Sequence, residues 1–378
     1  MKISTLLAQA GSRRDPHTGA ISMPIHPSSA FQHQALGQST GFDYSRTSNP
    51  TRLALEQTMA ALEGGARAVA FASGLAAIDA TLRLFSPGDA LVVTEDLYGG
   101  SFRLFEHFGR AQNLRFIYTD SSNTQETARA LAAPGVRGLF VEMPTNPMLR
   151  VADLDALADL ARPRGITFIV DNTFLTPALC KPLEHGADIV LYSATKYLGG
   201  HNDLVAGLAV ARNAETGERL AFVQNAAGAI LGPFESWLLL RSLKTLPLRM
   251  QKHEENAKAV AQFLLGHPKI QNVRYPGLPS DPGHERLLRQ SLGAGAMISF
   301  EAQSRDEVER ILASVQVFFF AESLGGAESL LTYPLVQTHA DIPPDTLEHI
   351  GLNERLLRLS IGLEDAGDLV QDLAQALG

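Results

Sequence analysis

Short apolar runs that alternate with helical stretches constrain the fold of this chain more than any other feature. Between residues 64 and 211 this alternation repeats several times. Strands buried on both faces read as continuous apolar runs, and neighbouring parallel strands need a crossover connection, usually a helix. The pattern predicts a doubly wound, mostly parallel α/β sheet. The predicted strands are residues 68–71, 90–94, 115–118, 138–142, 167–170, 189–192 and 207–211, and the predicted helices are 75–84, 101–108, 124–132 and 154–161.

The rest of the chain divides into an arm and a second domain. At about 150 residues per domain, 378 residues predict two or three domains. The segments 22–33 and 37–51 are rich in Pro, Ser, Gly, Thr and Asn, which favours loops. Residues 233–265 predict a long helix interrupted near Pro247, and the segment after it mixes strand and helix patterns. We expect an N-terminal arm (1–60), a large domain (61–250) and a small α+β domain (251–378).

Charge and cysteine content exclude several partner classes. The chain has 32 basic and 40 acidic residues, a net charge of −8, which argues against nucleic acid as the main partner. Its single cysteine, Cys180, cannot form an internal disulfide framework or a cysteine-rich metal cluster. Before Ala8-Gln9-Ala10 the apolar stretch is too short for a signal peptide, and no run approaches the ~18 residues of a membrane span. We expect a cytoplasmic protein with no membrane partner.

Most common catalytic motifs are absent from the sequence. It contains no GxxxxGK[ST], no HExxH, no GxSxG and no strand–GxGxxG–helix unit. The 11 histidines show no metal-ligand spacing, so we predict no metal site. These absences argue against the simplest NTPase, zinc hydrolase, serine esterase and dinucleotide-binding classes.

The segment 188–202, DIVLYSATKYLGGHN, combines a lysine with neighbours suited to a phosphorylated ligand. Lys196 follows a predicted strand, with Ser193 and Thr195 just before it and Gly199 and Gly200 just after it. An isolated lysine there is usually a solvated surface residue. Its amine can nevertheless form a Schiff base with a carbonyl compound, pyridoxal phosphate above all. The hydroxyls could hold a phosphate, and the glycines could let the backbone approach a ligand.

Three further features complete a candidate site for pyridoxal phosphate. Asp171 ends a predicted strand and could keep the cofactor's pyridine nitrogen protonated; the alternative is a turn or capping aspartate. Ser73 and Gly74 stand between a strand and a helix, where an anion can bind; such a pair is also a common helix cap. Tyr98 lies in a loop and could stack on the cofactor ring or simply pack the loop.

With these pieces in this order, the sequence resembles the Cys/Met-metabolism family of pyridoxal-phosphate enzymes. Residues 188–202 are similar to the family's cofactor-attachment signature at every constrained position, and the resemblance runs from residues 44–51 (YSRTSNPT) to 358–364 (RLSIGLE). The family includes cystathionine γ-synthase, cystathionine β- and γ-lyases, methionine γ-lyase and O-acetylhomoserine sulfhydrylase. The resemblance implies an aspartate-aminotransferase-like fold (fold type I), and small amino acids as substrates.

The resemblance also implies cofactor-binding roles. Lys196 would carry the cofactor and shuttle protons, Asp171 would pair with the pyridinium nitrogen, and Tyr98 would stack on the ring and assist proton transfer. Asn146 would lie near the cofactor's phenolic oxygen and the substrate. The residues implied to bind the phosphate are Gly74, Leu75, Ser193 and Thr195 of the same chain, and Tyr44 and Arg46 of a neighbouring subunit. A homodimer with shared sites is therefore implied, with a tetramer usual in the family.

Substrate binding is implied for residues near the C-terminus and in the arm. Arg358 would clamp the substrate α-carboxylate, with Ser323 beside it. Asp43 and Glu322 stand where γ-acting relatives have acidic residues that face the distal part of the substrate; the alternative is two solvated carboxylates. Thr47 stands where some γ-synthases have a second arginine, which argues against binding of a distal carboxylate there.

These features favour a γ-replacement reaction on an O-acylhomoserine with cysteine, as in cystathionine γ-synthase. Cystathionine β- or γ-lyase activity is the competing interpretation within the family. A pyridoxal-phosphate aminotransferase and a non-catalytic regulator that kept the fold are two further possibilities. We also expect a packed thiol at Cys180, a locally hydrogen-bonded His201, helix core at Trp237 and Leu238–Leu240, and a buried strand at residues 318–320.

Overall fold

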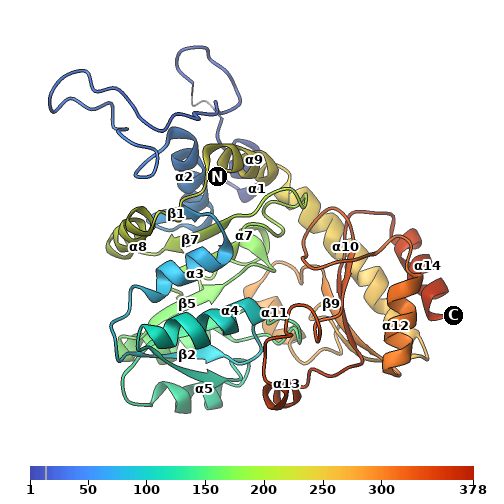
Figure 1. Cartoon of the computed structure of the whole chain (residues 1–378). Coiled ribbons are helices and arrows are strands. Elements are labelled where there is room, and N and C mark those ends of the chain that lie inside the picture. Colours follow the sequence, from blue (N-terminus) through green and yellow to red (C-terminus); the bar gives the residue numbers. More distant parts are fainter. Residues whose placement is uncertain (13–14) are drawn as a thin grey trace.

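A mixed sheet forms the centre of the larger part of the molecule. In the computed structural model, which describes residues 1–12 and 15–378, its seven strands have the order β1-β7-β6-β5-β4-β2-β3. Only β7 runs antiparallel to its neighbours, so the mostly parallel sheet is confirmed (Figure 1). The strands are β1 (Arg67–Phe71), β2 (Ala90–Thr94), β3 (Arg115–Thr119), β4 (Val136–Glu142), β5 (Thr167–Asp171), β6 (Ile189–Ser193) and β7 (Gly207–Ala211).

Helices cover both faces of this sheet because successive strand residues point to opposite sides. Val69 and Phe71 belong to one apolar cluster, with side chains of α3 and α8. Ala68 and Ala70 belong to the other, with side chains of α2, α6, α9 and α10 (Leu246–Gly266). The helices of this part are α1 (Ile3–Ala8), α2 (Pro50–Glu63), α3 (Gly74–Leu82), α4 (Gly99–Arg103), α5 (Thr124–Leu131), α6 (Leu154–Ala161), α7 (Thr176–Leu179), α8 (Ala214–Ala227) and α9 (Pro233–Leu243), and a π-helical turn (Leu104–Gly109) follows α4.

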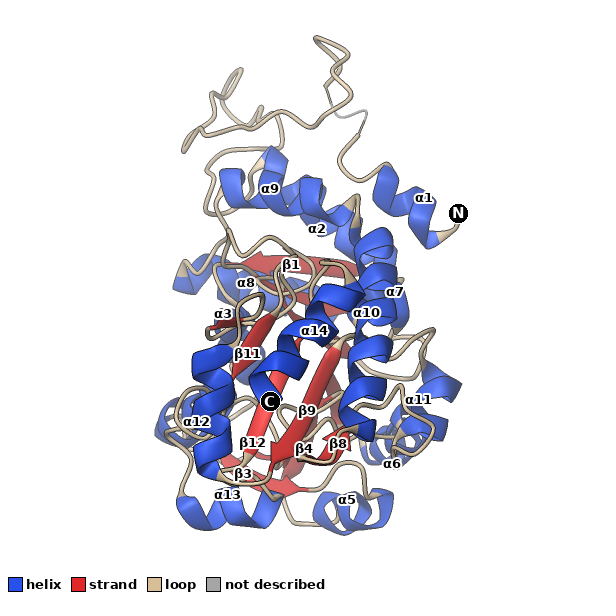
Figure 2. Ribbon diagram, turned by 90° about the vertical axis from the view of Figure 1, so that its right-hand side faces the viewer, coloured by secondary structure: helices blue, strands red, loops and turns tan. Residues whose placement is uncertain are grey.

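A second sheet forms the core of the C-terminal part, which is called the small domain below, and the part around the mixed sheet is called the large domain. Within the described chain it has five strands in the order β10-β11-β12-β9-β8, and all pairs except β10–β11 are antiparallel. Helices α10, α12 and α14 pack together and against it, so the predicted α+β class is confirmed (Figure 2). The elements are α10 (Leu246–Gly266), β8 (Ile270–Arg274), α11 (His284–Gln290), β9 (Met297–Ala302), α12 (Arg305–Ser314), β10 (Phe319–Phe320), β11 (Leu330–Thr332), α13 (Pro344–Ile350), β12 (Leu356–Ser360) and α14 (Ala366–Leu377).

Helix α10 connects the two parts and crosses the predicted domain boundary at residues 250–251. The predicted interruption near Pro247 is confirmed, since α9 ends at Leu243 and α10 begins at Leu246. His253 Nδ1 lies 2.7 Å from the carbonyl oxygen of Ile361, and Asn256 Nδ2 donates to that of Gly362 at 3.0 Å. These contacts tie the middle of α10 to the segment that follows β12.

The described residues between α1 and α2 are irregular, as predicted, but Ile3–Ala8 form helix α1, which the sequence analysis did not predict. Between α1 and α2 the described residues form no helix and no strand longer than a single bridge, and the chain extends away from the body (Figures 1 and 2). Helix α2 begins inside the predicted arm, because Asn49 Oδ1 accepts from the N–H groups of Thr51 and Arg52 and Pro50 occupies the first turn.

The prediction of a buried strand at residues 318–320 is wrong for two of its three residues. Phe318 is buried, but Phe319 and Phe320 are 58% and 49% exposed. The strand is only two residues long and lies at the edge of the small sheet, where it pairs with β11 alone. An apolar run by itself does not distinguish such an edge strand from a central one.

Candidate active site

One cavity of about 290 Å³ is lined by residues of both sheets. It lies at the carboxyl edge of the parallel strands, where ligands bind in open α/β sheets. Its volume is close to the lower end of the ~300–1,000 Å³ typical of ligand pockets. The predicted site residues that it brings together are Gly74, Leu75, Tyr98, Asn146, Asp171, Ser193, Thr195, Lys196, Glu322, Ser323 and Arg358.

Lys196 lies in a turn that begins where β6 ends. Its Nζ donates a hydrogen bond of 2.9 Å to Oγ of Ser323, which comes from the small domain. Burial lowers the pKa of Lys196 to about 8; the charge of Arg358 adds to this effect and that of Glu322 opposes it. A lysine amine must be neutral to attack a carbonyl, so the cavity makes this amine a better nucleophile near neutral pH.

Asp171 is a half-buried carboxylate without a cationic partner among the described residues. Its Oδ1 accepts hydrogen bonds from N and Oγ1 of Thr173 at 3.0 and 2.5 Å, and no ion pair joins it to another described residue. Burial raises the pKa of Asp171 to about 6, although the Thr173 hydrogen bonds oppose the shift. A carboxylate in this state stabilises a cation placed in the cavity, which suits the protonated ring nitrogen of pyridoxal phosphate.

Thr173 and Glu142 are two site residues that sequence reasoning missed. The Thr173 hydroxyl accepts from the N–H of Ser193 at 2.9 Å, so it links β6 to Asp171. Glu142 ends β4 directly beside Asp171 at the end of β5, and its Oε2 accepts from the N–H of Tyr98 at 3.1 Å. A carboxylate at the end of a neighbouring parallel strand was the signal that could have identified Glu142.

The junction between β1 and α3 provides a place for a phosphate. Ser73 caps α3 by accepting from the N–H of Ala76, and the first N–H groups of a helix have no acceptor within it. A Cβ added to Gly74 would lie 2.9 Å from Cβ of Ser193, so only glycine lets these two segments approach so closely. This N-terminus and the hydroxyls of Ser193 and Thr195 fit the phosphate of the cofactor.

Arg358 and Asn146 form a buried pair on the small-domain side of the cavity. Nη1 of Arg358 donates to Oδ1 of Asn146 at 2.7 Å, and Nη2 donates to the Ser323 carbonyl oxygen at 3.0 Å. Nε2 of His339, which sequence reasoning also missed, lies 3.0 Å from the carbonyl oxygen of Asn146. A carbonyl only accepts, so this nitrogen carries the proton and holds the Asn146 main chain. Fork-shaped guanidinium groups bind carboxylates well.

Glu322 and Ser323 are neighbours in a loop of the C-terminal part, and both line the cavity. Ser323 has a φ of +128°, a conformation rare outside glycine. This backbone directs its hydroxyl to Lys196 and its carbonyl to Arg358. Glu322 is exposed and lines the cavity, and its negative charge acts on both Lys196 and Arg358.

Asp43, Tyr44 and Arg46 do not line the cavity of their own chain. Tyr44 is 48% exposed, and the Arg46 guanidinium lies 5.5 Å from its ring centroid and donates to the Asn225 carbonyl at 2.7 Å. Asp43 accepts from Ser39 and lies 3.0 Å from Nε2 of His33. Their predicted roles in a neighbouring subunit's site remain predictions.

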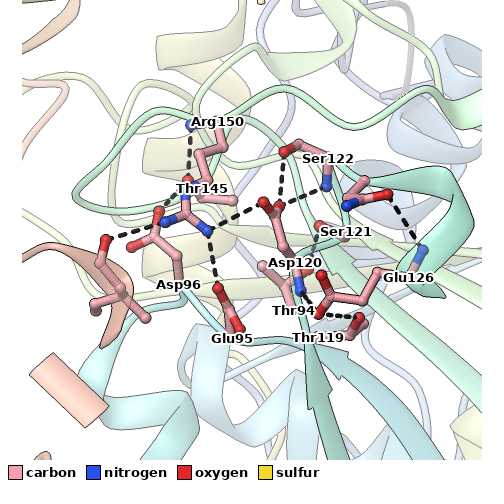
Figure 3. A network of polar contacts seen from close by, with 12 residues as sticks. Thr94, Glu95, Asp96, Thr119, Asp120, Ser121, Ser122, Glu126, Thr145 and Arg150 are labelled. Atoms are coloured by element: carbon pink, nitrogen blue, oxygen red, sulfur yellow. Dashed lines mark hydrogen bonds and ion pairs between the residues drawn. The ribbon is translucent and has the colours of Figure 1, made fainter. Parts of the chain in front are cut away.

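A polar network fixes the two loops that carry Tyr98 and Asn146 (Figure 3). Arg150 pairs with Glu95 at 2.9 Å and with Asp120 at 3.3 Å, and its Nη2 donates to the carbonyl oxygen of Ile350 in α13 at 3.0 Å. Thr145 donates to the buried Asp96 and accepts from the N–H of Arg150. The network therefore joins the ends of β2, β3 and β4 to the small domain.

Several predictions about single residues can be compared with the structure. Cys180 is buried and its pKa is raised by burial, as expected for a packed thiol. Nδ1 of His201 lies 2.7 Å from the carbonyl oxygen of Gly199, which confirms a local contact. Gly199 and Gly200, however, do not line the cavity, and Gly200 faces the guanidinium of Arg249. The idea that these glycines admit a ligand is wrong.

The fold and the cavity together define a pyridoxal-phosphate enzyme of fold type I, in which Lys196 and Asp171 could hold the cofactor. The family model described as Cys/Met metabolism PLP-dependent enzyme matches residues 4–378. The chain belongs to this family. Among the described residues, no helix is long and apolar enough to cross a membrane, and no group of His, Cys, Asp and Glu could hold a metal ion.

Relatives with several reaction names are similar to the chain. A cystathionine gamma-lyase of Bacillus subtilis (strain 168) is 46% identical over 377 residues, which cover 100% of this chain and 99% of the relative. A cystathionine gamma-synthase/O-acetylhomoserine (thiol)-lyase of the same organism is 48% identical over 375 residues, 99% and 96% of the two chains. The crystal structure of cystathionine gamma synthase from Xanthomonas oryzae pv. oryzae, in complex with aminoacrylate and cysteine, has a TM-score of 0.98 and 42% identity, and the match covers 100% of this chain and 98% of that one.

Proposed function

We propose that this trans-sulfuration enzyme catalyses γ-replacement: the sulfur of cysteine bonds to Cγ of an O-acylhomoserine, the Cγ–O bond breaks, and the acyl group leaves as a carboxylate, so that cystathionine forms. Relatives with synthase names support this reaction, and so does the position of Glu322. Its carboxylate lines the same cavity as Arg358 and Lys196. One substrate end thus meets a guanidinium and the other a carboxylate, which suits a product that carries an amino group at its distal end.

Different residues of the chain bind the substrate, accept its Cα proton and keep the cofactor protonated. Bound pyridoxal phosphate supplies an electron-poor ring that takes up the electrons of the broken Cα–H bond. Arg358 and Asn146 bind and orient the substrate α-carboxylate, and the Lys196 amine accepts the Cα proton at Nζ. Asp171 keeps the ring nitrogen protonated. Ser323 holds Nζ at 2.9 Å before reaction, and Tyr98 lines the same cavity.

Cleavage of cystathionine by β- or γ-elimination is the second candidate. It uses the same amine, carboxylate and guanidinium, and the relative named cystathionine gamma-lyase is 46% identical. The two reactions differ in whether a second amino acid enters the cavity before the product leaves.

Product analysis tests the proposal directly. The enzyme is incubated with O-acetylhomoserine plus cysteine and, separately, with cystathionine, and the thiols, keto acids and thioethers formed are identified. We expect cystathionine from the first mixture, with turnover at least tenfold faster than release of thiol and keto acid from cystathionine. The reverse order would assign the enzyme as a lyase. A Lys196→Ala protein that kept turnover in either assay would contradict the site itself.

We further propose that the enzyme acts in the cytoplasm as a homo-oligomer whose active sites are shared between subunits. The positions of Tyr44 and Arg46 outside their own cavity support this. Arg46→Ala and Lys196→Ala proteins can be unfolded together and refolded. In a shared-site dimer, hybrids contain one site with both residues intact, so the mixture regains activity that neither protein has alone. A mixture as inactive as its components would argue for sites built within one chain.

A further inference from the structure

The guanidinium of Arg249 is buried directly beneath the turn that carries Lys196. Its Nη1 donates to the carbonyl oxygen of Tyr197 at 2.6 Å, and its Nη2 lies 3.4 Å from that of Leu198. Nη2 also donates to the Ser242 carbonyl at 3.0 Å, and Nε donates to Oγ1 of Thr245 at 3.1 Å. The group that α10 presents to the turn thus binds the two residues that follow the lysine.

Arg249 has no carboxylate partner among the described residues. It is 5% exposed, and no ion pair joins it to any other described residue. Burial lowers the pKa of Arg249 to about 10. Only main-chain carbonyls and one hydroxyl compensate its charge, so its position is fixed by the atoms of the turn itself. A buried charge is costly unless it is hydrogen-bonded, and each hydrogen bond here therefore constrains the turn.

Gly200 provides the space for this contact. A Cβ at this position would collide with Nη1 of Arg249, and the residue has a φ of +71°. Its carbonyl oxygen accepts from the N–H of Ala327 at 3.0 Å, and its N–H donates to the Lys196 carbonyl at 2.7 Å. The glycine that was predicted to admit a ligand instead lets a guanidinium reach the turn.

We infer that Arg249 is a positioning residue that sets where the amine of Lys196 stands in the cavity, by holding the carbonyl groups of the next two residues. Arg249 does not line the cavity, so it acts through the turn and not on the substrate. Substrate binding depends on Arg358 and Asn146, whereas proton transfer depends on the place of Nζ. Loss of Arg249 should therefore slow proton transfer and leave binding nearly unchanged.

The test measures proton transfer apart from the complete reaction. The loaded enzyme is kept in D₂O with L-alanine, an amino acid without a leaving group, and replacement of its Cα hydrogen by deuterium is followed by NMR. A spectral titration gives the dissociation constant of L-alanine for the same protein. We expect Arg249→Met to lower the exchange rate about tenfold to a hundredfold. Its dissociation constant should stay within about threefold of that of the unmodified enzyme. The exchange rate of Arg249→Lys should lie between those of Arg249→Met and the unmodified enzyme.

Arg212 provides a control, although its side chain is exposed whereas that of Arg249 is buried. It lies just after β7, at the opposite edge of the sheet, and donates to the main-chain carbonyls of Ala187 and Leu183. Arg212→Met also removes an arginine that holds two carbonyls, so it should lower the melting temperature without slowing exchange. If the two methionine variants slow exchange equally, or if Arg249→Met exchanges at the normal rate, Arg249 has only a structural role.

Gly200→Ala tests the same contact without removing the guanidinium. Gly64 has a similar φ of +74° with open space around it, so Gly64→Ala carries the backbone strain without the clash. We expect Gly200→Ala to slow exchange at least fivefold more than Gly64→Ala. The effect should shrink in the Arg249→Met background, because the clash partner is gone. Additive effects in that double variant would overturn the inference. The comparison of Gly200→Ala with Gly64→Ala does not need Arg249→Met, so it stands even if that variant folds poorly.

Discussion

Nη1 of Arg358 donates a 2.7 Å hydrogen bond to Oδ1 of Asn146, and this contact joins the small domain to the large one inside the cavity. Asn146 is in turn held through its carbonyl by His339. The guanidinium is thus fixed before any substrate enters, and a fixed guanidinium loses little freedom when a carboxylate binds. Arg358 and the groups around it can be tested one at a time.

Arg358→Ala should raise KM for every amino-acid substrate by about a hundredfold or more, because a carboxylate would enter a buried cavity without a charged partner. Steady-state kinetics on the loaded enzyme measure it. Arg355→Ala is the control, since Arg355 lies just before the same strand and pairs with Glu301 at 2.8 Å. Equal KM values for the two variants would remove the carboxylate role from Arg358.

Glu322→Gln should weaken substrates with a distal amino group and spare those without one. The exposed carboxylate attracts an ammonium through solvent, so we expect KM for cysteine or cystathionine to rise about threefold to tenfold. KM for O-acetylhomoserine should stay within about twofold. Glu328→Gln provides the control, because Glu328 is exposed nearby and binds Asn202 at 2.8 Å instead of facing the cavity. A uniform rise for all substrates would contradict the assignment.

Capture of pyridoxal phosphate by the cofactor-free protein should speed up as pH rises through about 8, the pKa to which burial lowers Lys196. Below this pH most of the amine is protonated and cannot attack the aldehyde, so the rate should fall about tenfold per pH unit. Stopped-flow growth of the visible absorption band measures the rate. In Glu322→Gln the midpoint should move to lower pH, since Glu322 raises this pKa. A midpoint near 10.5, the value of a free lysine, would show that the cavity does not act on the amine.

Glu142→Gln should retain most activity, whereas Glu142→Leu should lose at least tenfold in kcat. Burial and the neighbouring Asp171 raise the pKa of Glu142 well above its usual range, so the neutral carboxyl is favoured. Glutamine keeps both the neutral form and an oxygen for the N–H of Tyr98, which Glu142 accepts at 3.1 Å. Leucine is also neutral but has no acceptor, so it leaves the main-chain N–H of Tyr98 unpaired. A large loss in the glutamine variant would mean that the negative charge of Glu142 is required.

The large sheet could be predicted closely because its strands are buried on both faces. Such strands are continuous apolar runs, and the residues that end them, Asp171 and Ser193, are then placed at the carboxyl edge by topology alone. Lys196 comes three residues after Ser193, so it is placed at the same edge for the same reason. Resemblance to a family supplied Arg358, Ser323 and Glu322, which lie in a different domain and share no local pattern with the lysine.

The sequence analysis missed residues whose role depends on strand register or on a contact between the two domains. Glu142 matters only because β4 and β5 align it with Asp171, and His339 only because its loop reaches Asn146. Gly200 was misinterpreted for a related reason. A glycine in sequence indicates a close approach, but the approaching group, Arg249, lies 49 positions along the chain in another helix. Local pattern carries no information about which group that is.

Near its start, helix α10 binds the turn of Lys196 through Arg249. Further along, His253 and Asn256 bind the residues that follow β12, the strand that contains Arg358. Because a helix advances about 1.5 Å and turns about 100° per residue, α10 sets the distance between the amine of Lys196 and the guanidinium of Arg358. A single inserted residue between these attachment points would turn one set of contacts away from its target.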